Sequence, residues 1–316
     1  MVVSAPKKIV PVLRLFREAF TNLKANDPVR MAGATSFFTF FALPPIVIML
    51  SNVLSPVLNE QHQLVSYRLF AELSKLLGPR SANQLQDISQ HLQNRPPTLP
   101  MTLVGFFLLL LASTTLFSVV KSSLNQLWNV RPKASRGFVH TLKDRGIALV
   151  IILFSGLLFS ISLTIDQRLA VLQQGMLTST PTLRDWLSSG GNYLLSVVII
   201  TFWFASVFNY LPDVRVPRRA VWVGALVTSV LFKVGELILN RLLINSQVAN
   251  LYGASGSVIL LLLFVFYSSL IFYYGASFTR TFARTNQPDP EPNATAVSYE
   301  ITDLLPPNAA GTTDKS

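Results

Sequence analysis

The stretch SVILLLLFVFYSSLIFYYGASF, residues 257–278, contains no charged side chain. An α-helix rises about 1.5 Å per residue, so a helix of this length can cross a hydrocarbon core of about 30 Å. Inside lipid the backbone amides must bond within the chain, and a helix satisfies them most simply. The stretch therefore predicts a membrane-spanning helix.

Five more apolar runs of suitable length precede this one. Only 13% of the 316 residues are charged, whereas about a quarter of a soluble domain is charged. No segment has the alternating polarity of a membrane β-strand. We therefore predict an all-α fold, a polytopic membrane helical bundle with six transmembrane helices. The other five helices are expected at residues 31–54, 99–120, 146–165, 193–211 and 221–239.

The first of these runs has a clear start and an internal interruption. Asp27 and Pro28 form a typical helix start, because a side-chain cap precedes a proline at the first helical position. Pro44 and Pro45 lie inside the run. Proline removes a backbone donor and clashes with the preceding turn, so we expect a kink or a break there.

Residues 1–26 are predicted to form a cytoplasmic, interfacial amphipathic helix. Arg14, Arg17 and Lys24 share the helix with apolar side chains that recur at helical spacing. Such a helix suits either the surface of an anionic leaflet or a packing site on its own protein, and the sequence leaves both open. The apolar positions are Ile9, Val12, Leu13, Phe16, Phe20 and Leu23.

Two further segments lie outside the expected spans. Residues 55–98 are predicted to form an extracytoplasmic helical hairpin within a membrane domain that covers residues 27–284. Residues 285–316 are rich in Pro, Asn and Thr and have little apolar surface to bury, which predicts a disordered cytoplasmic tail. The apolar faces of the two hairpin helices hold Leu69, Leu73 and Leu76, and Leu85, Ile88 and Leu92.

The distribution of basic residues predicts the orientation. One set of connecting segments consists of residues 1–30, 121–145, 212–219 and the end of the last span with Arg280 and Arg284. Together these segments hold 17 Lys and Arg. The connecting segments on the opposite side of the membrane hold 7. Basic loops stay in the cytoplasm, so both termini are expected to face the cytoplasm of a bacterial inner membrane. The same rule explains the net charge of +11 without nucleic acid. Membrane lipids are the expected partners, and other envelope proteins are a second candidate; the sequence indicates no oligomeric state.

Charged residues inside the spans are the most informative positions. Lys233 and Glu236 are three residues apart in the fifth span and therefore share a helix face. With Ser229 and Asn240 they form a polar stripe that should face protein or a water-filled cavity. The stripe fits an ion or substrate pathway, or a site for an anionic headgroup. It also fits a neutralised pair that only fixes helix packing.

A second polar stripe lies at the end of the second span. It holds Thr114, Ser118, Lys121 and Asn125, for which interhelical hydrogen bonding is the favoured interpretation. Catalytic patterns are absent from the sequence. The three histidines are isolated, and no phosphate-binding glycine loop or nucleophile elbow occurs. We therefore expect no catalytic residue, no metal site and no cofactor.

Four stretches together resemble a known family. They are DPVRMAGATSFFTFFALPPIVIML (27–50), SSLNQLWNV (122–130), NYLPDVRVPRRAVWVGAL (209–226) and LYGASGSVILLLLFVFYSSLIFYYGASFT (251–279). The chain resembles the YihY/virulence factor BrkB family of bacterial inner-membrane proteins. The positions that match family motifs are Pro44, Asn125, Trp128, Pro212, Arg218, Trp222, Gly224, Tyr252, Gly253, Gly275 and Ala276.

The resemblance permits several functions. The family commonly has Gly-Ala-Glu near the end of its last span, but Ser277 occupies the Glu position here. An older family name implies ribonuclease activity, which the residues do not support. Movement of an envelope lipid or other amphiphile is the leading hypothesis for a non-enzymatic protein. A cation/proton antiporter that uses Glu236, and a structural envelope component without transport, are the alternatives.

Overall fold

The structure is a computed structural model of the whole chain. The parts that it describes are residues 12–58, 61–77, 82–83, 85–87, 89–90, 114–133, 143–158, 161, 191–244, 256–286 and 290–299.

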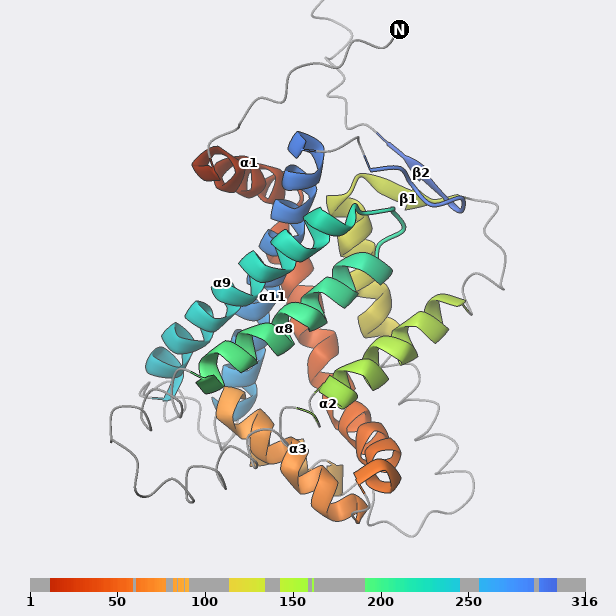
Figure 1. Cartoon of the computed structure of the whole chain (residues 1–316). Helices are drawn as coiled ribbons and strands as arrows, with labels where there is room; N and C mark the ends of the chain where they lie inside the picture. The colour runs from red at the N-terminus through yellow and green to blue at the C-terminus, as the bar shows by residue number, and fades with distance from the viewer. Residues whose placement is uncertain are drawn as a thin grey trace, which may run out of the picture.

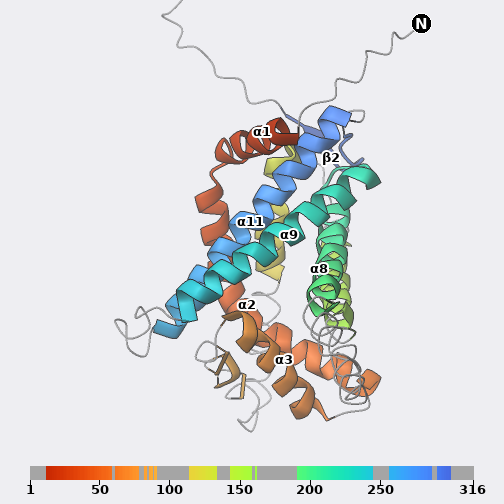
Figure 2. The ribbon, with the colours of Figure 1, turned by 60° about the vertical axis from the view of Figure 1, so that its left-hand side comes forward.

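Long helices dominate the described residues, and a short two-stranded ribbon lies at one end (Figure 1). Two further helical segments cover residues 114–127 and 143–158. Figure 2 places α1 and the ribbon at one end of the molecule and α3 at the other. The named elements are α1 (Val12–Lys24), α2 (Pro28–Leu58), α3 (His62–Leu77), β1 (Val130–Pro132), α8 (Gly191–Tyr210), α9 (Arg218–Ile244), α11 (Gly256–Asn286) and β2 (Ala296–Ser298).

Four of the described helices are long and apolar enough to cross a membrane. They are α2, α8, α9 and α11, and they correspond to the predicted first, fourth, fifth and sixth spans. The predicted second and third spans lie partly outside the described residues, so the count of six remains a prediction. The helix that ends the second span continues to residue 127, so Lys121 and Asn125 lie inside it, beyond the expected end of the span at residue 120.

α2 is not broken at Pro44 and Pro45, where we expected a kink or a break. α2 is a single helix of 31 residues that contains both prolines and Pro56. Ala42 and Val47, which flank the proline pair, are buried. Tertiary packing therefore holds the helix together where backbone hydrogen bonds are missing, as spanning helices commonly allow. Asp27 has a φ of 52°, and the chain turns there from α1 into α2, whose predicted start at Pro28 is confirmed.

α3 packs along the last turns of α2. Val65, Leu69 and Phe70 are buried in one cluster with Leu50 and Leu54 of α2. The first half of the predicted hairpin is therefore a helix, and Leu69 and Leu73 of its expected apolar face pack in this cluster; the side chain of Leu76 lies outside those described. Leu85 from the second half is buried in the same cluster, whereas Ile88 and Leu92 lie outside the residues whose side chains are described.

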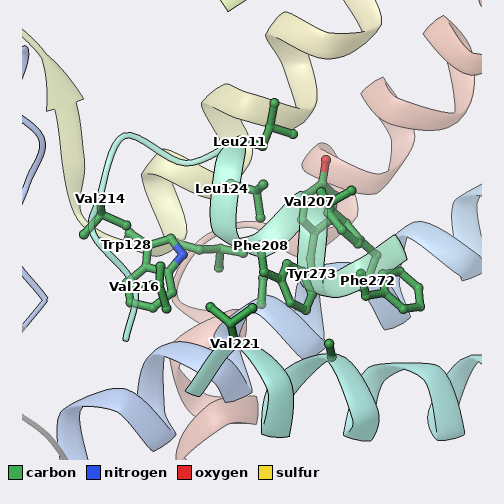
Figure 3. Close-up of a cluster of buried hydrophobic side chains, with 14 of the residues drawn as sticks. Leu124, Trp128, Val207, Phe208, Leu211, Val214, Val216, Val221, Phe272 and Tyr273 are labelled. Carbon is green, nitrogen blue, oxygen red and sulfur yellow. The ribbon is translucent and has the colours of Figure 1, made fainter. Parts of the chain in front are cut away.

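A second and larger cluster lies nearer the ribbon. Trp128, Phe208 and Tyr273 meet there from three segments that are far apart in the sequence (Figure 3). Phe208 packs on Phe272, with ring centroids 5.4 Å apart. This cluster joins the ends of helix 114–127 and α8 to the middle of α11.

Part of the predicted disordered tail is ordered. β2 pairs antiparallel with β1, so that Val130 lies opposite Ser298. Pro292 forms a bridge with Val214, in the short connection between α8 and α9. Residues 290–299 therefore form a strap across two connecting segments. The prediction of disorder was wrong for this part because it considered only the tail's own composition and not the unpaired edges available to it.

α9 and α11 approach most closely through two reciprocal pairs of small residues. A Cβ on Gly224 would overlap the hydroxyl of Thr279, and a Cβ on Gly275 would overlap the hydroxyl of Thr228. The members of each helix are four residues apart, so both pairs lie on one helix face. Small residues at such a crossing allow close backbone approach.

We predict that Gly275→Ala destabilises the protein by about 1–3 kcal/mol, because the added methyl group overpacks this crossing. Thermal unfolding in detergent, followed by circular dichroism, measures the effect. Gly33→Ala is the matched control, since its added Cβ meets no atom from another part of the described chain within 4 Å. Equal midpoints for the two variants would contradict the close crossing.

We also predict that removal of residues 287–316 destabilises the end of the bundle that holds β1 and β2. The deletion uncovers Val130 and Val214, which are buried, and should cost about 2–5 kcal/mol. Removal of residues 300–316 alone keeps the strap and is the control. If both truncations unfold at the same temperature as the full chain, the strap contributes nothing to stability.

Candidate functional site

Two sets of polar side chains are the most informative among the described residues of the bundle. One is the predicted stripe on α9. The other is a set of hydrogen-bonded groups at the end of the bundle near α1 and the ribbon. An unpaired polar group in an apolar surrounding is costly. The hydrogen-bond and ion-pair partners of each set therefore show what its polar groups do.

Lys233 and Glu236 form the ion pair that their spacing suggested. Lys233 Nζ lies 2.9 Å from Glu236 Oε2, and the side chains are 18% and 16% exposed. One turn earlier on the same stripe, Ser229 is fully buried and its hydroxyl lies 2.7 Å from the hydroxyl of Thr201 on α8. Asn240 is the fourth residue of the predicted stripe, and its side chain is not among those that the structure describes.

The ion pair lies at a border on the surface of α9. Ser229, one turn before Lys233, faces α8. Leu237, one turn after Lys233, is half exposed, as are Val234 and Ile238. The pair therefore separates a buried polar face from an outward apolar face. By helix rise, Lys233 is about 22 Å from Arg218, the start of α9.

The second stripe forms an interhelical charge network. Lys121 Nζ lies 2.9 Å from Asp213 Oδ1 and 2.7 Å from Asp144 Oδ1. Asn125 Nδ2 donates to Asp213 Oδ2 at 2.9 Å, and the backbone N–H of Asp213 donates to Asn125 Oδ1 at 2.8 Å. Three segments are thus joined: helix 114–127, the start of helix 143–158 and the connection after α8.

Asp213 is the residue that the sequence interpretation missed in this network. Its side chain is only 7% exposed. The available signal was its isolation, because it is the one acidic residue in the connection 212–219, which otherwise carries three arginines.

Arg280 forms the other part of this polar end. It lies two residues beyond the predicted last span, yet it is buried. Its Nη1 donates to the carbonyl of Leu127 and, at 3.0 Å, to Asn22 Oδ1 of α1. Ser277 donates to the carbonyl of Ala19 at 2.7 Å and accepts from Asn22 at 3.0 Å. The residue that departs from the family pattern therefore attaches α1 to α11.

Within the described parts of the chain, no group of three or more His, Asp or Glu side chains could hold a metal ion.

Comparison with known proteins identifies the family. A family model described as virulence factor BrkB matches residues 19–299. The chain belongs to the virulence factor BrkB family. This confirms the resemblance, and the matched region includes the strap at residues 290–299.

The BrkB-family chain is also similar to curated proteins named UPF0761 membrane protein. One from Psychromonas ingrahamii is 25% identical over 265 residues, which are 79% of this chain and 81% of the relative. One from Alteromonas mediterranea is 25% identical over 278 residues, 86% of this chain and 88% of the relative. No solved structure matches the chain. These relatives and the four apolar helices indicate a multi-pass membrane protein.

The positions that match BrkB-family motifs have different surroundings. Asn125, Trp128 and Pro212 lie together at the buried polar end, where Asn125 bonds Asp213. Gly224 and Gly275 are the close contacts of α9 and α11. Tyr252 and Gly253 are outside the described residues. Of the rest, Ala276 is buried, Trp222 and Arg218 are exposed, and Pro44 lies inside α2.

We predict that Asp213→Asn destabilises this BrkB-family protein by about 1.5–3 kcal/mol, because hydrogen bonds to a charged, buried acceptor are lost. Glu18→Gln is the matched control. It removes the exposed i,i+4 pair between Arg14 and Glu18, which should contribute less than about 1 kcal/mol. Unfolding midpoints in detergent compare the two, and a larger loss in the control would contradict the importance of the network.

Proposed function

We propose that this chain helps a lipid or another amphiphile of the cell envelope to move across or out of the inner membrane, without catalysing a covalent reaction. The observation that supports this best is the Lys233–Glu236 pair at the border of an outward apolar face. An amphiphile needs both kinds of surface at once. Its charged headgroup requires charged partners, and its tails require apolar contact.

The ion pair suits a zwitterionic or anionic headgroup in particular. A phosphate can accept from Lys233, while an amine can donate to Glu236, so the headgroup exchanges with the internal pair without leaving a lone charge in lipid. The tails can remain along Val234, Leu237 and Ile238. When the headgroup replaces the contacts between Lys233 and Glu236 in this way, the free energy of removing it from water is lowered.

We place both termini in the cytoplasm. The excess of basic residues on that side supports this orientation. So does the pairing of β1 with β2 and the bridge from Val214 to Pro292, which join three segments that were assigned to one side of the membrane. Membrane lipids are the proposed partners, other envelope proteins are a second candidate, and nucleic acid is not proposed.

Cation/proton antiport is the second candidate. Glu236 is the only acidic side chain within the four described helices that can span a membrane, and a proton carrier needs such a group. A structural component without transport is the third candidate, in which the pair would only hold helices together.

Reconstitution into liposomes tests these functions. Movement of a labelled phospholipid between leaflets and sodium-driven proton exchange are measured on the same preparation. We expect lipid movement, reduced about tenfold or more by Lys233→Met and by Glu236→Gln, since each change leaves a lone charge where the headgroup binds. Arg241→Gln is the matched control, because Arg241 is exposed near the end of the same helix.

The double variant Lys233→Met with Glu236→Gln separates the three functions. It should recover the folded yield that a lone intramembrane charge reduces. Recovered yield with lost lipid movement supports the proposal. Recovered yield together with full activity would mean that the pair only supports packing. Proton exchange that depends on Glu236, without lipid movement, would establish the antiporter instead.

A further inference from the structure

α1 has an outer face that none of the described contacts uses. Leu13, Arg17, Phe20 and Lys24 follow one another at spacings of four, three and four residues, which places them in one line along the helix. Leu13 is 83% exposed and Phe20 is 60% exposed, and both basic residues are exposed as well. Large apolar and basic side chains therefore alternate along this outer face.

The opposite face of α1 is fixed to α11. Leu15 and Ala19 are buried against Phe278, and the ring of Phe16 lies 4.8 Å from that of Phe278. Tyr274 donates a hydrogen bond of 3.1 Å to the carbonyl of Phe16. α1 is thus held in one orientation, and its outer face is presented away from the bundle.

The position of α1 relative to α2 sets its depth in the membrane. Lys24 ends α1, and α2 begins four residues later at Pro28 and is long and apolar enough to span. Figure 2 shows α1 lying across the end of the bundle and not along it. A helix in this place is expected at the level where α2 enters the hydrocarbon, among the lipid headgroups.

The charge pattern identifies the partner. The carboxylate of Glu18 is bound by Arg14 at 2.7 Å on the flank of the helix, which leaves Arg17 and Lys24 as the charges of the outer face. Basic residues near an anionic leaflet attract its headgroups, and large apolar residues between them insert into the boundary with the acyl chains.

We propose that the outer face of α1, formed by Leu13, Arg17, Phe20 and Lys24, docks on the anionic phospholipid surface of the membrane that α2 crosses. The sequence left open whether this helix lies on an anionic leaflet or packs on its own protein. In this proposal the outer face lies on the leaflet, and the opposite face packs on α11. The docking does not depend on the proposed function, because a scaffold or an antiporter would use the same surface.

A single spin label tests the docking in the full chain. The sequence contains no cysteine, so Thr21→Cys introduces one labelling site beside the outer face, at an exposed residue whose hydroxyl bonds only the carbonyl of Arg17 among the described groups. The labelled protein is placed in nanodiscs of phosphatidylcholine, with or without phosphatidylglycerol. Collisions with oxygen report lipid, and collisions with a neutral nickel chelate report water.

We expect the label to become more accessible to oxygen and less accessible to nickel when phosphatidylglycerol is present. Arg17→Gln with Lys24→Gln should lower the ratio of docked to undocked helix about tenfold or more, because both headgroup attractions are lost. Arg215→Gln with Arg219→Gln is the matched control. It removes the same charge from exposed positions at the same end of the bundle and should leave the ratio unchanged.

Three results would overturn the proposal. One is equal accessibility in neutral and anionic nanodiscs. Another is an equal loss of docking in the control variant, which would indicate attraction by total charge only. The third is protection from both oxygen and nickel, which would mean that protein covers the face. Circular dichroism and elution as a single species verify that each variant is folded.

Phe20→Asp should also weaken docking. This change removes the apolar insertion but keeps both basic residues.

Discussion

The arrangement of the bundle depends on the close crossing of α9 and α11. Gly224 and Gly275 leave room for Thr279 and Thr228, and the hydroxyls of both threonines are turned back to the carbonyls of Gly275 and Gly224 on their own helices. Apolar helices gain little from simply leaving lipid for one another, so shape and close packing must decide where they meet. This crossing makes α11 the axis on which the other elements are assembled.

Single hydroxyl contacts attach further helices to the crossed pair of α9 and α11. Thr35 of α2 meets Tyr273 of α11 at 2.6 Å, and Thr201 of α8 meets Ser229 of α9 at 2.7 Å. Ser277 of α11 holds α1 through the carbonyl of Ala19. A hydroxyl can satisfy its own helix and a neighbour at the same time, so these residues specify a partner with little cost of burial. The charged side chains described above lie at the ends of the bundle or, for Lys233 and Glu236, at the border between the buried and outward faces of α9.

The sequence was sufficient for the features that depend on one helix at a time. Apolar length predicted α2, α8, α9 and α11, and i,i+3 spacing predicted the Lys233–Glu236 pair. It was insufficient where distant segments complete one another. The partner of Asn125 is 88 residues away at Asp213, and nothing in the local pattern of Arg280 indicates that Asn22 and Leu127 surround it. The order of residues 290–299 likewise depends on strand edges at Val130 and Val214, which composition does not reveal.

The strap at residues 290–299 has a consequence for how the protein is made. It follows α11 in the sequence, yet it completes β1 and the connection at Val214, which are synthesised earlier. Those segments emerge with unpaired backbone edges and must wait until α11 has been made. Final closure of this end therefore comes after the synthesis of α11. A chain that stops early, or whose last helix inserts in the wrong direction, keeps open edges that cellular quality control can recognise.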